Sequence, residues 1–108
     1  MNPTERTLRA LRAQGYTAQV VEKWNPHARV RHDLFGCIDI VAIHDNHVGV
    51  LGVQACADSS ISLRRAKAEN EPRIAQWIRT GNRFQVWGWA KKGPRGCRKL
   101  WTARVVGL

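Results

Sequence analysis

The fold is decided by the stretch Cys37-Ile38-Asp39-Ile40-Val41-Ala42-Ile43, an apolar run interrupted by a single acid. A second apolar run covers residues 48–56, and Asp45-Asn46 stands between the two runs, where a turn is expected. Runs of nearly continuous apolarity are typical of strands that are buried on both faces of a sheet. We therefore expect a central hairpin with strands over 34–43 and 48–56.

On the N-terminal side of this hairpin, the sequence predicts a helix and then a strand. Thr4 can cap a helix, Glu5 stands in its first turn, and Gly15 ends it. Residues 16–24 alternate in polarity and include β-branched side chains, until Asn25-Pro26 interrupts the pattern. This alternation predicts a strand over 16–24.

On the C-terminal side, the sequence predicts helical segments and a second hairpin. Ser59 or Ser60 can cap a helix over 61–70, and Pro72 suits the first turn of a helical continuation. Strand patterns over 83–91 and 100–106 flank a turn rich in glycine and proline. The resulting order predicts an α/β fold, a mixed central sheet flanked by helices, in a single domain over 1–108.

The chain is strongly basic, since 18 Lys and Arg against 8 Asp and Glu give a formal net charge of +10. So large a charge on a small surface attracts polyanions, of which nucleic acid is the commonest. No run approaches ~18 consecutive apolar residues, and the N-terminus has no apolar signal core. We expect a soluble cytoplasmic protein that does not enter a membrane.

Two polar side chains interrupt the central apolar runs and are the first candidates for chemistry. Asp39 and Gln54 stand on neighbouring predicted strands, and an unpaired buried carboxylate would cost several kcal/mol. Mg²⁺ bound between them would satisfy both, and a purely structural hydrogen bond would do so equally well. Asp33 could be a second ligand or could orient Arg31 or His32, and we favour the orienting role.

The order of elements and the position of these residues resemble the PD-(D/E)XK nuclease fold, also called restriction-endonuclease-like, with its αβββαβ core. The resemblance rests on Glu5 in the first helix, on Asp39 in the strand after residues 29–36, and on the run over 49–56. Within this fold, the chain is most similar to archaeal-type Holliday junction resolvases and their small phage and bacterial relatives.

This resemblance implies a catalytic site made of Glu5, Asp39, Gln54 and Lys67, with Mg²⁺, or Mn²⁺ in its place, held by Asp39 and Gln54. In the family, an acid occupies the position of Gln54, and a lysine two residues later helps to activate water. Here that lysine position holds Cys56, which cannot act as a cation, and Lys67 on the following helix is the candidate replacement. Because Gln54 is neutral, we expect weaker metal binding than in the family.

Clusters of basic residues are the candidates for contact with nucleic acid, because arginine suits bidentate phosphate contacts. The expected nucleic-acid-binding residues are Arg6, Arg29, Arg31, Arg64, Arg65, Lys91, Lys92 and Arg95. The tryptophans are expected in the core, with stacking of Trp89 on an exposed base as the alternative for that residue.

The sequence therefore favours a Mg²⁺-dependent endonuclease that acts on double-stranded or branched DNA, and the resemblance implies a homodimer. The alternative is a catalytically degenerate protein of nuclease fold that binds nucleic acid without cutting it. A third reading, a basic protein that docks on an acidic protein, leaves Asp39 and Gln54 unexplained.

Overall fold

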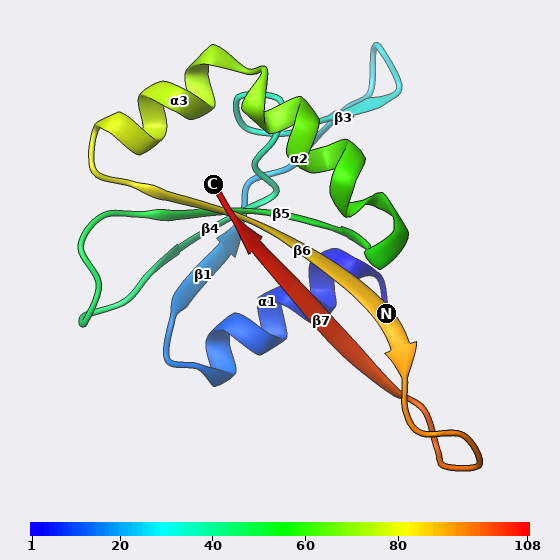
Figure 1. The fold of residues 1–108 in the computed structure, drawn as a ribbon. Coiled ribbons are helices and arrows are strands. Elements are labelled where there is room, and N and C mark those ends of the chain that lie inside the picture. Colours follow the sequence, from blue (N-terminus) through cyan, green and yellow to red (C-terminus); the bar gives the residue numbers. More distant parts are fainter.

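The two apolar runs form neighbouring strands at the centre of a five-stranded sheet in the computed structural model, which describes residues 1–108 (Figure 1). The strands follow one another across the sheet in the order β1 (Thr17–Val20), β4 (Ile40–Ile43), β5 (Leu51–Ala57), β6 (Arg83–Lys92) and β7 (Leu100–Gly107). β5 and β6 run parallel, whereas the other neighbouring pairs are antiparallel. The expected α/β fold with a mixed sheet is confirmed.

Helices cover both faces of this sheet. α1 (Pro3–Ala13) packs on one face, and α2 (Ile61–Glu69) and α3 (Pro72–Arg79) pack on the other. A short 3-10 turn, η1 (Asp58–Ser60), leads from β5 into α2, so the helices make the crossover that neighbouring parallel strands require. No helix combines the length and the apolar composition that crossing a bilayer requires.

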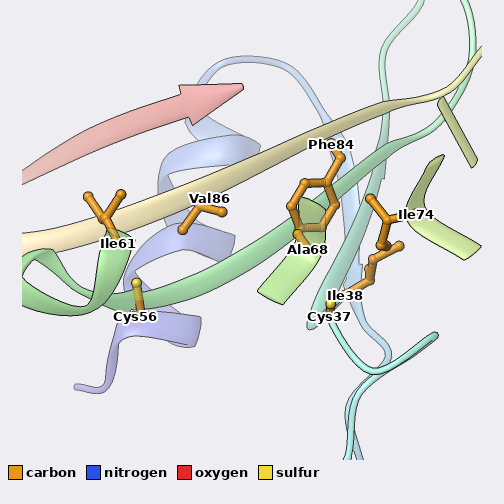
Figure 2. Packing of buried hydrophobic residues seen from close by; sticks show 8 residues of the cluster. All are labelled: Cys37, Ile38, Cys56, Ile61, Ala68, Ile74, Phe84 and Val86. Carbon is orange, nitrogen blue, oxygen red and sulfur yellow. The ribbon is translucent and has the colours of Figure 1, made fainter. Parts of the chain in front are cut away.

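The sheet separates two apolar clusters because its side chains alternate between the two faces. On the side of α1, the cluster contains Leu11, Ile40, Leu51, Val53 and Trp87 among its members. Figure 2 shows the cluster under α2 and α3, which consists of Cys37, Ile38, Cys56, Ile61, Ala68, Ile74, Phe84 and Val86. Burial on both faces explains why the central strands are nearly free of polar residues.

The strand expected over 34–43 is shorter than its apolar pattern indicates. Leu34 and Ile38 form an isolated bridge around a tight turn in which Phe35 has a φ of 53°. Regular pairing with β5 begins only at Ile40, opposite Val53. The expectation is wrong for the first part of the run, and Asp39 consequently lies at the entrance of β4.

A second small sheet was not expected. The segment over 16–24 divides into β1 and β2 (Lys23–Asn25), and β2 pairs with β3 (Val30–His32) in a two-stranded hairpin. Its turn is held by Asn25, whose side-chain oxygen accepts the backbone N–H groups of His27 and Ala28. At the N-terminus, a side-chain oxygen of Asn2 caps α1 in place of Thr4.

Two tryptophans lie outside the core, contrary to expectation. Trp24 is 57% exposed on the small hairpin, and Trp101 is 45% exposed on β7. Trp87 is buried as expected, and the half-buried Trp89 donates its Nε1–H to the hydroxyl of Thr7 at 2.8 Å. Strand alternation alone could not exclude Trp101 from the core, because it does not show that β7 is the edge strand.

Candidate functional site

Three carboxylates meet where β1 ends and β4 begins. Oxygen atoms of Glu22, Asp33 and Asp39 all lie within 4.8 Å of one another, and we call these residues the acidic cluster. The backbone N–H of Val21 donates to the carbonyl of Asp39 at 2.8 Å, which holds the segment that carries Glu22 beside the start of β4. Residues distant in sequence are thus brought together by the irregular ends of neighbouring strands.

Asp39 is the most buried member of the acidic cluster, with an exposed fraction of 5%. Its Oδ2 accepts the backbone N–H of Ala55 at 2.9 Å, and no cation pairs with it. Burial raises the pKa of Asp39 to about 8, with further contributions from a hydrogen bond to Asp33 and from the negative charges of Asp33 and Glu22. The metal-free cluster therefore retains a proton at neutral pH.

Gln54 lies beside the acidic cluster, as the pairing of β4 with β5 requires. The pairing of Ile40 with Val53 continues to place Asp39 opposite Gln54, and Asp39 donates its N–H to the carbonyl of Val53 at 2.9 Å. The side chain of Gln54 is 1% exposed, and its Nε2 lies 3.5 Å from Oδ2 of Asp33. Its Oε1 is buried without a hydrogen-bond partner, an arrangement that costs free energy.

A cleft of about 390 Å³ lies beside the acidic cluster, next to the first turn of α1. Glu5, Glu22, Arg31 and Ala55 are among the residues that line it. Glu5 therefore faces the same cleft as Glu22, but it does not belong to the group of carboxylates within 4.8 Å. Of the acidic cluster, Glu22 lines this cleft, whereas Asp33 and Asp39 do not.

The role expected for Asp33 is wrong, because Arg31 is paired with another acid. Nη1 of Arg31 lies 3.0 Å from Oε1 of Glu22, and Asp33 has no hydrogen bond with Arg31 or His32. Asp33 instead faces Gln54 and Asp39. The structure thus adds Glu22 to the candidate site, and it brings Asp33 next to Asp39, where the alternative role of Asp33 as a second ligand would require it.

Two basic residues of α2, Arg64 and Lys67, lie near the buried cysteines Cys56 and Cys37. Burial raises the pKa of the Cys56 thiol, and the largest opposing influence is the charge of Arg64. Burial also raises the pKa of Cys37, and there the largest opposing influence is the charge of Lys67. Arg64 and Lys67 form no ion pair, and Nε of Arg64 is buried without a partner.

The other predicted nucleic-acid contacts are spread over three regions. Arg29, which has a φ of 53°, and Arg31 lie in or beside the small hairpin, and Arg65 pairs with Glu69 within α2. The remaining basic residues gather around the β6–β7 hairpin, where Arg6 stacks on Trp101, and this group also contains Lys91, Lys92 and Arg95. No single patch contains the whole predicted set.

Part of the candidate site could be inferred from the sequence and part could not. Glu5, Asp39 and Gln54 were signalled by a helix start and by interrupted apolar runs. Glu22 had only one weak signal, an acid after a β-branched pair.

Comparisons with family models, with curated proteins and with solved structures find no match for this chain.

Proposed function

We propose that this protein is a divalent-metal-dependent endonuclease of PD-(D/E)XK type that acts on DNA. The acidic cluster with the unpartnered Oε1 of Gln54 beside it carries this proposal. In a chain with a net charge of +10, three carboxylates have converged at one point and no basic side chain pairs with the innermost of them.

The donor set fits Mg²⁺ or Mn²⁺. Both prefer oxygen ligands, and Glu22, Asp33 and Asp39 would hold the ion. A half turn of the Gln54 amide exchanges its oxygen and nitrogen, so Oε1 can face a cation in place of the present Nε2 contact. The bound ion would act as the Lewis acid for phosphodiester hydrolysis.

The surroundings of the acidic cluster supply the other requirements of such a site. The cleft next to α1 admits a phosphodiester, and Glu5 at its rim is placed to accept a proton from water. Arg31 lines the same cleft, where a guanidinium can bind phosphate oxygens. Arg64, whose charge acts on the Cys56 thiol, is a second candidate besides Lys67 for the cation that the family has on the strand.

The element order supports the same proposal. α1, three antiparallel strands β1, β4 and β5, the helices α2 and α3, and the parallel strand β6 follow the αβββαβ order of the resemblance. Asp39 directly precedes β4 and Gln54 lies on β5, the two strands that would carry the metal ligands in this proposal. The family's preference for branched DNA and its homodimer form part of the proposal.

The test compares the wild-type protein with Asp39→Asn and with the control variant Asp45→Asn. Asp45 is an exposed acid in the β4–β5 turn and is not part of the acidic cluster. Each protein is incubated with a four-way junction, a linear duplex and single-stranded DNA, in Mg²⁺, Mn²⁺ or EDTA. We expect metal-dependent cutting by wild type and Asp45→Asn, and none by Asp39→Asn; equal cutting by all three would refute the assignment.

A second candidate function is binding of DNA without cleavage. It is favoured by Cys56, which occupies the lysine position and is a buried neutral thiol whose pKa is raised. If salt-sensitive DNA binding accompanies no cleavage in any metal, this function replaces the first. Sedimentation of the protein with and without a four-way junction tests the homodimer.

A further inference from the structure

The far end of the β6–β7 hairpin leaves the body of the protein. β6 pairs with β5 only as far as Trp89, opposite Ala57, whereas its pairing with β7 continues to Lys92, opposite Leu100. Residues 91–102 are all exposed, and Figure 1 shows this segment projecting beyond the sheet. We call residues 91–102 the basic ribbon.

The charge of the basic ribbon has one sign. It contains five basic residues and no acid, namely Lys91, Lys92, Arg95, Arg98 and Lys99. Only Lys92 lies near a carboxylate, since its Nζ is 3.7 Å from Asp58. The other four have no ion-pair partner, so their charge is available to a ligand.

The tip of the basic ribbon has a defined conformation. The backbone N–H of Cys97 donates to the carbonyl of Pro94 at 3.1 Å, and Gly96 supplies the positive φ of 82° that this turn requires. Nζ of Lys99 donates to the carbonyl of Gly93 at 3.3 Å. A preformed tip loses less conformational entropy on binding than a flexible loop would.

The base of the basic ribbon is braced by an aromatic side chain. The guanidinium carbon of Arg6 lies 3.8 Å from the ring centroid of Trp101, and Nζ of Lys91 lies 5.6 Å from it. These cation–π contacts hold two positive charges over an exposed ring and link the ribbon to α1. The ribbon is thus anchored on the helix whose first turn lines the cleft.

We propose that the basic ribbon inserts into the major groove of double-stranded DNA and is the docking arm of this protein. A two-stranded β-ribbon fits the major groove of B-DNA, which is about 12 Å wide and about 8.5 Å deep. The deep, narrow major groove of double-stranded RNA excludes it. The inference rests on the proposed function only in taking DNA as the ligand.

The topology relates this arm to the cleft. β5 and β6 are parallel, so they end at the same edge of the sheet, and Ala55 near the end of β5 lines the cleft. Its partner in β6 is Trp87, and the basic ribbon begins four residues farther along that strand, roughly 13 Å at ~3.3 Å per residue. A duplex held by the ribbon would therefore reach the edge of the sheet where the cleft opens.

The first experiment measures binding in EDTA, where no metal-dependent cleavage can occur. Arg95→Gln/Arg98→Gln is compared with Arg9→Gln/Arg79→Gln, which removes the same charge from two exposed helical arginines without ion pairs. Anisotropy of a labelled 20-base-pair duplex is recorded at several salt concentrations. We expect at least tenfold weaker binding and a salt slope lower by about two units for the ribbon variant, at ~0.9 per lost phosphate contact.

A second experiment uses Cys97, the only exposed cysteine, because Cys37 and Cys56 are buried. We expect saturating duplex DNA to slow alkylation of Cys97 by N-ethylmaleimide at least fivefold, and double-stranded RNA of the same sequence to leave it unchanged. Equal losses of affinity in both double variants, unchanged alkylation in bound DNA, or equal protection by RNA would each overturn the proposal.

These results separate the ribbon from the nuclease. Ribbon-dependent binding without cleavage in any metal would support the docking arm and refute the proposed nuclease activity. Metal-dependent cleavage that Arg95→Gln/Arg98→Gln leaves unaltered, together with unaltered binding, would support the nuclease and refute the docking arm.

Discussion

Replacement of Asp39 by asparagine should stabilise the metal-free protein at neutral pH and remove a large part of its pH dependence. Asparagine keeps the shape of the side chain, and its amide oxygen can still accept the N–H of Ala55 while its nitrogen donates to Asp33. The substitution removes only the ability of this side chain to ionise. The groups that face Asp39 are Asp33, Glu22 and the N–H of Ala55, and none of them is a cation.

The magnitude follows from the difference between the folded and unfolded pKa values of Asp39. Its pKa is about 8 in the folded protein and 3.8 in an exposed aspartate. Because the folded value is raised, the associated stability is fully present below pH 3.8 and is lost as the pH rises towards 8. At ~1.4 kcal/mol per unit, the loss by pH 7 is about 4 kcal/mol.

The assay is urea unfolding of wild type and Asp39→Asn in EDTA at half-unit steps from pH 4 to pH 8. The free energy of unfolding of the variant should rise relative to wild type across this range, by about 5 kcal/mol in total. Other titrating groups are common to both proteins and cancel in the difference. A difference that stays within about 1 kcal/mol at all pH values would refute the buried, proton-retaining arrangement.

Three further predictions concern the same two faces of the sheet. At pH 8, Mn²⁺ at a hundred times its dissociation constant should stabilise wild type by ~3 kcal/mol in urea unfolding and leave Asp39→Asn unchanged. Gly88→Ala should lower the free energy of unfolding by about 1–3 kcal/mol, since its Cβ would overlap the isoleucine that begins α2. Gly107→Ala should have a small effect, because its Cβ would meet only the carbonyl oxygen of Phe84, at 4.0 Å. Trp89→Phe should cost about 1 kcal/mol in the same assay by removing the hydrogen bond to the buried Thr7 hydroxyl; a loss below ~0.3 kcal/mol would contradict this.

The central part of the fold could be predicted from the sequence because burial on both faces leaves a strong pattern. β4 and β5 carry this pattern. The start of α3 has a different signal, the proline at position 72 in its first turn. The turn before Asp39 could not be predicted, since its residues are as apolar as those of a strand. What ends the regular pairing there is a local turn with positive φ at Phe35 and Gly36, closed by the bridge between Leu34 and Ile38.

The clearest sequence signal for the candidate site was an acid or amide that interrupted an apolar run. Asp39 and Gln54 met this condition, and cross-strand register then brought them together. Glu22 and Asp33 stand in polar stretches, where an acid is unremarkable. Their place beside Asp39 depends on the path of the chain around the small β2–β3 hairpin, which local pattern does not encode.

The positions of Glu22, Asp33 and Arg64 bear on Gln54 and Cys56, which stand where the family that the chain resembles has an acid and a lysine. A carboxylate at position 54 would be the fourth acidic group at this point, beside Glu22, Asp33 and Asp39, and the pKa of Asp39 is already raised. A neutral amide at position 54 is therefore electrostatically favourable. Similarly, Arg64 provides a cation next to Cys56 from the helix that covers it. In the proposed nuclease site, charges that are missing along β5 would therefore be supplied by neighbouring elements.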